Sequence, residues 1–462
     1  MPASTLSDLE QRDDFIRRHI GPGEAQIAAM LETLGLPSLD ALIEKTVPEN
    51  IITGHTLEIG GDKTERGTLS YLRRMSERNK VFISMIGMGY YGTKLPGVIL
   101  RNVLENPGWY TAYTPYQAEV SQGRLEALMN FQQMIMDLTG MDLANASLLD
   151  EGTAAAEAMA MAHRLCKTGS DAFFVADDCH PQTIAVVETR ARSMGFTIVR
   201  GDPFSDLAGH DIFGVLAQYP GTTGAVRDLR PVIDMAHDKG ALTTVATDLL
   251  ALVLLKPPGE MGVPMGYGGP HAAFFATRDE FKRQTPGRII GVSVDTAGRP
   301  ALRMALQTRE QHIRREKATS NICTSQVLLA ILAGFYAVYH GADGLTHIAR
   351  KVLRMTRILA EGLKRLGFEI ETEDFFDTIT VVVPGQANAL AARARESRIN
   401  LRLVDKDRLS ISFDETTRRK NLMSLWKVFS TKADNVLDIE ELDRTAGHGL
   451  PEDLRRTSGF LG

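Results

Sequence analysis

The sequence predicts an α/β protein, with a large domain built on a mostly parallel, doubly wound sheet and a small α+β domain after it. From Val81 onward, apolar runs bounded by turn residues alternate with helix-period segments, the pattern of βαβ units. These runs are apolar almost throughout, as in strands that a parallel sheet buries on both faces. After Gly367 a shorter mixture of strands and helices begins, and this change predicts the small domain.

Residues 1–80 are predicted to form a helical N-terminal segment. Gly21-Pro22-Gly23 ends one helix, Ser38 can cap the start of another, and Thr64 precedes a helix with a polar face. No strand pattern alternates with these helices. The segment is therefore expected to be an appendage to the fold rather than part of its core.

The large domain is predicted over residues 81–330. Its strands are expected at Ala172–Ala176, Thr197–Val199, Ile212–Gln218, Leu242–Ala246 and Ala272–Ala276. Its helices are expected at Gln122–Leu138, Gly152–Cys166, Thr183–Met194 and Leu229–Lys239. A long helical stretch from Leu302 to Leu366 is expected to follow, with interruptions near Ser320 and Gly341.

The small α+β domain is predicted over residues 331–440. Its elements are expected to be strand Thr378–Val383, helix Ala387–Arg398, strand Leu401–Val404, strand Arg408–Phe413 and helix Arg418–Phe429. The final segment, 441–462, is rich in Asp, Glu, Arg and Gly and is predicted to be a linker or tail.

Composition argues against several classes of protein. The 462 residues carry 52 Lys and Arg against 57 Asp and Glu, which disfavours a strongly basic nucleic-acid binder. Three cysteines in so long a chain disfavour a disulfide framework. The longest apolar stretch, Val327–Tyr339, is shorter than the about 20 residues that span a bilayer, and acidic residues near the start disfavour an export signal. We therefore expect a soluble, cytoplasmic protein with no nucleic-acid or membrane partner.

Two tyrosine-rich segments are candidate site loops. Gly87–Gly92 matches GxGxxG, but Pro96 follows where a dinucleotide site would need a helix, so a turn presenting Tyr90 and Tyr91 is predicted instead. The segment 110–119 packs three tyrosines into an irregular stretch. It either lines a pocket or anchors a loop against the core, and its composition favours neither.

Two segments at predicted strand and helix ends allow both a site and a simpler structural role. The small residues of Asn145–Thr153 suit a phosphate cradle at a helix N-terminus, but Asp150 and Glu151 would repel phosphate and serve equally as a cap. His180 follows a predicted strand, where it either stacks on a flat cofactor or, as the favoured interpretation, is a surface-loop histidine. The neighbouring cysteine and His180 lack further ligands at zinc spacing, so no metal site is predicted.

Asp248 ends the predicted strand Leu242–Ala246, where an acid can either hold the pyridinium nitrogen of a pyridoxal cofactor or cap a helix. A pyridoxal enzyme also needs a lysine for the Schiff base. Lys94, Lys256 and Lys282 lie among prolines or polar residues and are predicted to be surface lysines. No catalytic residue is therefore assigned in this chain.

Taken together, these segments resemble the glycine cleavage system P-protein family, the glycine decarboxylases that depend on pyridoxal 5'-phosphate (PLP). The resemblance extends over nearly the whole chain, which is similar to the N-terminal half of the long-chain form or to the first subunit of the split form. The matching segments are Arg18–Pro22, Met85–Tyr90, Glu105–Tyr116, Glu119–Arg124, Ser147–Glu157, Gly262–His271, Pro286–Val292 and Gln307–Ser325.

The resemblance implies a type I PLP (aminotransferase-like) fold and two homologous halves, of which only the C-terminal half keeps the Schiff-base lysine and binds most of the PLP. The complete enzyme would decarboxylate glycine and pass the aminomethyl group to the lipoylated H-protein. This chain would then need the lysine-bearing half as its partner, with His180 and Asp248 as relics of cofactor-holding positions. The residues that would border the shared active site are Tyr90, Tyr91, Tyr113 and Tyr116.

Two rival hypotheses remain open: a catalytically inactive scaffold or docking subunit, and a standalone pyridoxal decarboxylase that uses Lys256. The chain also departs from the family where Gly262 runs directly into Val263, since the family has a strand and a loop of about a dozen residues there. The sheet must then close up, re-pair or be locally disordered. The chain ends at Gly462, in what resembles the connector to the lysine-bearing half.

Overall fold

The protein is described here by a computed structural model. The chain divides into two units, Met1–Val81 and Phe82–Gly462. The structure describes residues 5–10, 21–55, 57–59, 64–111, 115–258, 273–307, 311–318, 322, 325–430, 437–447 and 449–462.

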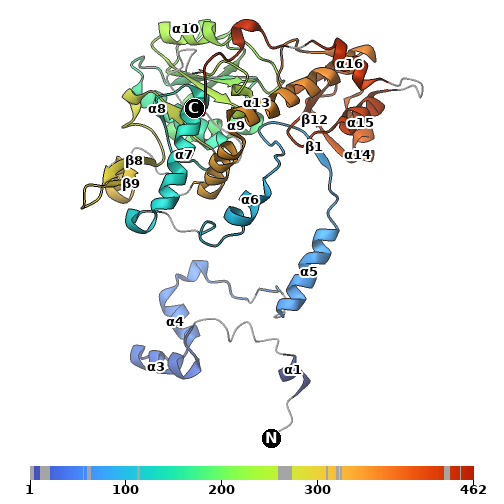
Figure 1. The fold of residues 1–462 in the computed structure, drawn as a ribbon. Coiled ribbons are helices and arrows are strands. Elements are labelled where there is room, and N and C mark those ends of the chain that lie inside the picture. Colours follow the sequence, from blue (N-terminus) through green and yellow to red (C-terminus); the bar gives the residue numbers. More distant parts are fainter. Residues whose placement is uncertain are drawn as a thin grey trace. The chain divides into compact units, whose positions relative to one another are not determined.

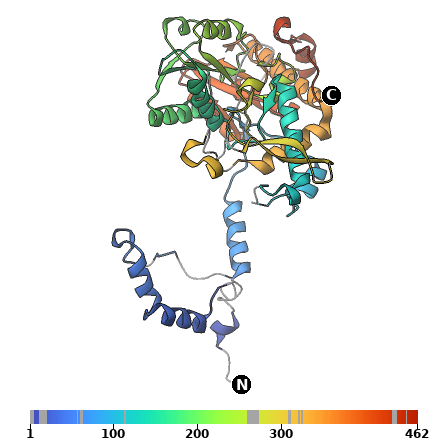
Figure 2. The same cartoon turned by 90° about the vertical axis from the view of Figure 1, so that its left-hand side faces the viewer.

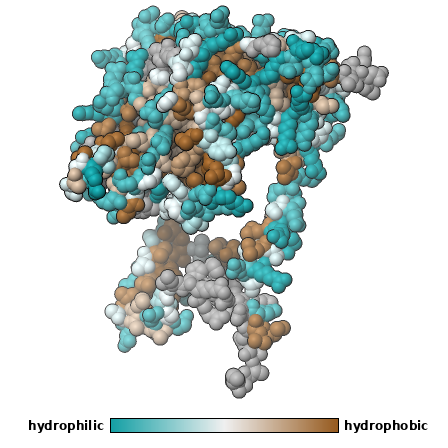
Figure 3. Space-filling view, in the orientation of Figure 1, coloured by the Kyte–Doolittle hydropathy of each residue, from teal (hydrophilic) through white to brown (hydrophobic). Residues whose placement is uncertain are grey.

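The first unit is helical, as the sequence predicts. Ser38 and Thr64 cap helices as expected, since the Ser38 hydroxyl accepts from the Ala41 N–H and the Thr64 hydroxyl from the Gly67 N–H. No described residue of this unit is buried, and Figure 3 shows apolar surface on it. Its helices therefore share no core of their own. They are α1 (Leu6–Leu9), α3 (Glu24–Leu34), α4 (Leu39–Thr46) and α5 (Glu65–Glu77), with a 3₁₀ turn at Glu49–Ile51.

The second unit contains a four-stranded sheet in the order β4–β3–β5–β6. All three strand pairs are parallel, and each strand overlaps one of the predicted strands, which confirms the mostly parallel sheet. Every residue of β5 is buried, as its apolar run indicated. The strands are β3 (Ala172–Ala176), β4 (Thr197–Gly201), β5 (Gly214–Tyr219) and β6 (Leu242–Thr247).

Helices cover both faces of this sheet, so the fold is doubly wound (Figures 1 and 2). Phe173 and Val175 of β3 pack in one cluster with α8 (Glu151–Leu165) and α9 (Pro181–Met194). Phe174, which points to the opposite face, packs with residues of α10 (Arg230–Asp238). The observed helices lie within two residues of the predicted ends because their apolar periodicity and caps are local signals.

The sheet does not continue beyond β6 in the described part of the chain. β7 (Ala276–Thr277), which overlaps the predicted strand Ala272–Ala276 at one residue, pairs antiparallel with β2 (Leu143–Ala144) in a separate sheet. The break falls where the resemblance leads us to expect an additional strand. Among the described residues, β6 and β7 therefore do not pair with each other. Residues 259–272, which connect this part of the chain, are not among the described residues.

The predicted helical stretch is wrong at its start, because Leu302 lies in a hairpin of β8 (Ile289–Val294) and β9 (Pro300–Ala305). The Asp295 carboxylate accepts hydrogen bonds from the N–H groups of Ala297 and Arg299, which is typical of a turn that joins two strands.

Helix α13 (Val327–Arg365) follows after α12 (Gln311–Arg314), and the predicted interruption at Gly341 is confirmed by a left-handed φ of 61°. The interruption expected at Ser320 lies outside the described residues. By length and composition alone, α13 is the one described helix that could cross a membrane, a criterion that core helices of soluble proteins also meet. Gly334 in its first half packs against α7 (Gln122–Thr139), and Gly362 in its second half lies against Trp426.

The small domain is a five-stranded sheet in the order β1–β12–β13–β11–β10. β1 precedes the large domain in sequence but pairs in parallel with β12 of the small domain. The loop after β1 therefore leads from the small domain's sheet to the large domain. The predicted elements of this domain are all present. They are β11 (Thr378–Val382), α14 (Ala387–Glu396), β12 (Ile399–Leu403), β13 (Arg408–Ser412) and α15 (Arg419–Phe429). The sheet also contains two strands that the sequence did not predict, β1 (Ile83–Met85) and β10 (Glu369–Ile370).

The C-terminal segment packs against the rest of the second unit. It begins with α16 (Ile439–Thr445), and Leu442 and Leu454 are buried. The Arg456 guanidinium donates to the carbonyl oxygens of Leu138 and Leu252, at 2.8 and 3.0 Å. These contacts tie the segment to the ends of α7 and of α11 (Leu249–Leu252).

Candidate functional site

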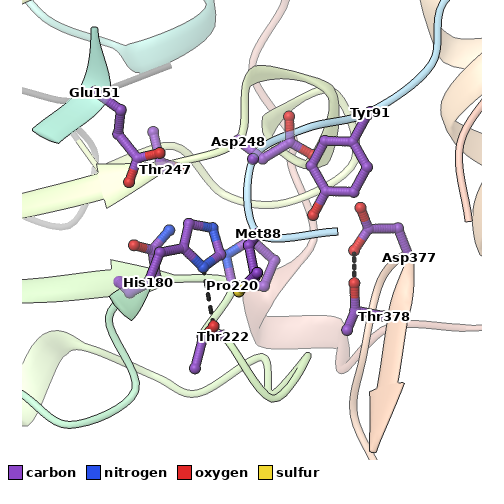
Figure 4. Close-up of a pocket in the computed structure, with 13 residues that line it drawn as sticks. Met88, Tyr91, Glu151, His180, Pro220, Thr222, Thr247, Asp248, Asp377 and Thr378 are labelled. Atoms are coloured by element: carbon purple, nitrogen blue, oxygen red, sulfur yellow. Dashed lines mark hydrogen bonds between the residues drawn. The ribbon is translucent and has the colours of Figure 1, made fainter. Parts of the chain in front are cut away.

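A polar cavity lies where the carboxyl ends of the parallel strands face the small domain (Figure 4). This is the edge at which open α/β sheets bind their ligands. The large domain contributes the residues that follow its strands, the small domain contributes the start of β11, and the loop after β1 closes one side. The lining residues are Met88, Gly89, Tyr91, Glu151, His180, Gln218, Pro220, Gly221, Thr222, Thr247, Asp248, Asp377 and Thr378.

His180 precedes α9 and is 7% exposed, so the favoured surface-loop interpretation is wrong. The imidazole Nδ1 lies 3.0 Å from the Thr222 hydroxyl, in the turn after β5. Arg402 of the small domain donates to the same hydroxyl at 2.7 Å. Burial, together with the Arg402 charge, lowers the pKa of His180 to about 4, so the ring is neutral near pH 7.

Asp248 follows β6 and caps α11, one of the two roles that its position allowed. Its carboxylate oxygens accept from the N–H groups of Leu250 at 3.0 Å and Ala251 at 3.3 Å. The same carboxyl group lines the cavity, where burial raises its pKa to about 6. Capping and lining are therefore compatible at this position.

Asp377 and Tyr91 meet on the side of the cavity formed by the small domain and the loop after β1. The Thr378 hydroxyl donates to the Asp377 carboxylate at 2.9 Å. Burial, and then the charge of Asp248, raise the pKa of Asp377 to about 7. The pKa of the buried Tyr91 phenol also lies well above its usual value, mainly through burial. Sequence reasoning missed Asp377 because only the packing of the two domains brings the start of β11 to this cavity.

The start of α8 is occupied by its own acidic residues, as the capping interpretation of this segment requires. The Asp150 carboxylate accepts from the Thr153 N–H at 2.7 Å. Glu151 turns into the cavity, where it accepts from the Thr183 hydroxyl at 2.6 Å. Burial raises the pKa of Glu151 to about 7. A phosphate at this helix end would face these two carboxyl groups.

Of the four tyrosines expected to border a shared active site, Tyr91 lines this cavity. The predicted turn that carries it is confirmed, since Gly87 and Gly89 have φ values of 68° and 88°. Tyr90 is exposed and is not among the lining residues. Tyr116 accepts a hydrogen bond from Arg288 at 2.7 Å, away from the lining set, and Tyr113 lies outside the described residues. That these four tyrosines border an active site shared with a partner stays a prediction.

The residues described around the cavity do not fit a covalently bound PLP molecule. No lysine or arginine is among them, so neither a Schiff-base amine nor a cationic phosphate ligand lines the space. Glu151 lies at the helix end that would have to receive the phosphate. The free space accommodates about one water-sized molecule. Lys256 is not a lining residue, and its backbone N–H donates to the Leu454 carbonyl.

The raised carboxyl pKa values predict that folding stability falls as the pH rises from about 4 to about 7. In that range the folded protein holds protons on Glu151, Asp248 and Asp377 that the unfolded chain has released. Glu151→Gln should therefore flatten the pH profile of urea unfolding and stabilise the chain at pH 8 by about 1–3 kcal/mol. Glu396→Gln, at an exposed site on α14, is the control. An unchanged profile in Glu151→Gln would contradict the prediction.

A doubly wound sheet followed by a small α+β domain, with a histidine and an aspartate at the sheet's carboxyl edge, defines a type I PLP fold. Solved PLP enzymes share this fold. The cystine C–S lyase C-DES, with glycine covalently linked to its PLP cofactor, superposes with a TM-score of 0.54 at 16% identity, covering 77% of this chain and 97% of that chain. *Sphingomonas wittichii* serine palmitoyltransferase superposes with a TM-score of 0.51 at 13% identity, covering 79% and 89%. Likeness at this level of identity shows the fold alone.

The chain belongs to the glycine cleavage system P-protein family, whose profile matches residues 17–429. The crystal structure of a glycine decarboxylase (P-protein) in inhibitor-bound form superposes with a TM-score of 0.78 at 30% identity. The superposition covers 89% of this chain and 99% of that chain. The resemblance found in the sequence is thereby confirmed.

Curated relatives of this chain are named glycine dehydrogenase (decarboxylating). That of *Stutzerimonas stutzeri* is 56% identical over 472 aligned positions, which cover 99% of this chain and 49% of the relative. That of *Rhodopseudomonas palustris* strain BisA53 is 54% identical over 473 positions, which cover 100% and 49%. The chain therefore spans about half the length of these relatives.

Proposed function

We propose that this chain is one half of a glycine-decarboxylating enzyme and that it acts only together with a second, lysine-bearing half. The observation that carries the proposal is the cavity itself. His180 and Asp248 lie together at the carboxyl edge of the sheet, but no lysine is among the described residues that line it. A site that has the histidine and the aspartate but no lysine amine supports a structural role for this chain, with the covalent chemistry performed by its partner.

In the complete enzyme, PLP would supply an electron sink for the carbanion left when glycine loses carbon dioxide. The second half would bind most of that cofactor, and the aminomethyl group would pass to a lipoylated H-protein. The role of this chain would be to hold the loops that border the shared site. We place the assembly in the cytoplasm, in keeping with bacterial relatives of this name.

Two further observations support a heteromeric half-enzyme. The superposed glycine decarboxylase chain is matched over 99% of its length, so a chain of about this extent exists as a separate polypeptide in that solved structure. Apolar side chains are also exposed on the second unit, including Val120 at 75%, Val292 at 70% and Val338 at 68%. A face that a partner covers would account for exposed apolar side chains if they are contiguous.

The test reconstitutes the enzyme from its halves. The chain is mixed with the second half of the *Stutzerimonas stutzeri* relative, lipoylated H-protein and PLP, and carbon dioxide release from labelled glycine is measured. Each half alone should give background release, and the mixture should exceed it by about 100-fold or more. A mixture that forms a complex without releasing carbon dioxide would favour the inactive scaffold.

A second readout separates the standalone enzyme from the half-enzyme. The chain is incubated with PLP alone, reduced with borohydride and analysed by intact mass. We expect no mass increase corresponding to bound cofactor, and Lys256→Ala should leave the reconstituted activity unchanged. A stable cofactor adduct that disappears in Lys256→Ala, together with release of carbon dioxide by the chain alone, would refute the proposal.

A further inference from the structure

The hairpin of β8 and β9 projects from the second unit, and only its base is buried (Figure 1). Ile290 of β8 and Met304 of β9 are buried at this base. Val292 and Val294, which lie nearer the turn, are 70% and 66% exposed. An isolated two-stranded hairpin is only marginally stable in water. The outer part of this hairpin therefore lacks the packing that stabilises a pair of strands.

The apolar side chains of the hairpin form one continuous face. Residues two positions apart in a strand point to the same side, and directly paired residues of neighbouring strands do so as well. Three successive pairs on one side are apolar; the innermost pair belongs to the buried core, and the outer two, which we call the hairpin face, extend to the turn. From the base outward, the pairs are Ile290 with Met304, Val292 with Leu302, and Val294 with Pro300.

The opposite side of the hairpin carries small, polar or charged residues. Its pairs are Gly291 with Arg303 and Ser293 with Ala301. Antiparallel strands usually turn their apolar side toward a core and their polar side toward water. The sequence of this hairpin follows that pattern, yet the two valines of the hairpin face remain exposed among the residues that the structure describes. The pattern therefore indicates that another surface packs on the hairpin face.

The segment before α7 adds a further apolar side chain beside the hairpin. The Gln122 amide binds the backbone of β9, because its Nε2 donates to the Leu302 carbonyl at 2.8 Å and its Oε1 accepts from the Leu302 N–H at 2.9 Å. The 3₁₀ turn Ala118–Val120, just before Gln122, also contacts β9, and Val120 is 75% exposed. Figure 3 shows apolar surface in this part of the molecule. Val120 therefore extends the apolar surface of the hairpin face.

The area of this surface indicates which partner covers it. Its aliphatic side chains can bury on the order of 100 Å² each, whereas each partner in a standard interface buries about 800 Å². A second copy of this chain that met the hairpin face with its own would therefore form an incomplete interface. A partner that also contacts this chain elsewhere fits better. The lysine-bearing half does so under the proposed function, since it shares the active site, and about half the length of the curated relatives lies outside the match to this chain.

We propose that the hairpin face and Val120 are a docking surface for the lysine-bearing half. Docking buries the two valines and supplies the packing that the outer hairpin lacks. The hairpin is then an arm that this chain extends onto its partner, in addition to the contacts at the shared site. This inference rests on the proposed function, because that proposal supplies the partner.

The test measures binding of the full 462-residue chain to the second half of the *Stutzerimonas stutzeri* relative by isothermal titration calorimetry. The double variant Val292→Glu/Val294→Glu places two charges on the hairpin face and should weaken binding by about 100-fold or more, because docking would bury them without partners. Ser293→Glu, in the same strand but on the opposite side, is the matched control and should bind within about 3-fold of the wild type. Urea unfolding checks that both variants are folded.

A photocrosslinking measurement does not depend on the stability of the charged variant. The photoreactive amino acid p-benzoylphenylalanine in place of Val294 should capture the second half, whereas the same amino acid in place of the exposed Glu396 on α14 should not. Equal binding by the wild type and the double variant would overturn the docking surface and leave the half-enzyme proposal intact. Capture of a second copy of this chain, or a cross-link within the chain itself, would also overturn it. A wild-type chain that does not bind the second half would overturn the half-enzyme proposal, and this inference with it.

Discussion

Inserting a strand between Gly262 and Val263 should raise the free energy of unfolding of this chain by about 3–9 kcal/mol. The expected gain arises because β6 pairs only with β5 in the described structure, and β7 lies in a separate two-stranded sheet. A strand placed between them would add on the order of six ladder hydrogen bonds, each stabilising by about 0.5–1.5 kcal/mol. The match to the *Stutzerimonas stutzeri* relative runs over 472 positions against the 462 residues of this chain, so the relative supplies residues that this chain lacks.

The experiment compares two insertions of the same length, about a dozen residues each. One carries the corresponding segment of the relative, and the other carries only Gly and Ser. Lengthening a loop changes closure entropy by only about 0.6 kcal/mol per doubling, so the Gly/Ser insertion should leave urea unfolding nearly unchanged. Hydrogen exchange at the amides of β6 should slow only with the relative's segment. Equal stability of the two insertions would show that β6 does not need a further strand.

The fold followed from the sequence wherever the signal was local. The strand Ala172–Ala176 was predicted at its observed bounds because an apolar run between turn residues is read directly from the chain. The hairpin of β8 and β9 was missed because Val292 and Val294 remain exposed, so the strands have little burial to mark them. The parallel pairing of β1 with β12 joins residues more than three hundred positions apart, and no local pattern indicates such a pairing.

The candidate site was predictable only on the side of the large domain. His180 and Asp248 were identified because they follow strands, and the carboxyl edge of a parallel sheet is a general ligand position. Asp377 and Gln218 gave no such signal. Asp377 reaches the cavity through domain packing, and Gln218 lies inside an otherwise apolar strand, where a single polar residue in a buried run was the only available indication.

Gly224→Ala should destabilise the chain by about 3 kcal/mol or more, because this glycine lies where the large domain contacts the small one. Its φ is 97°, and an added Cβ would overlap the Thr378 carbonyl group. The turn around it is held by two bonds to the small domain: the Val226 N–H donates to the Asp374 carbonyl, and the Thr380 hydroxyl donates to the Thr223 carbonyl, both at 2.9 Å. The turn cannot move away without breaking these bonds.

The matched control is Gly298→Ala in the turn between β8 and β9. Gly298 also has a positive φ, 78°, but nothing lies within 4 Å of the position of its added Cβ. The Gly298→Ala variant should therefore lose only about 1 kcal/mol of folding stability, which is the cost of an alanine with a positive φ. The difference between the two variants in urea unfolding, expected to be about 2 kcal/mol, measures the overlap with the small domain. Equal losses would mean that the two domains separate readily enough to relieve the contact, and the cavity between them would then be open to solvent.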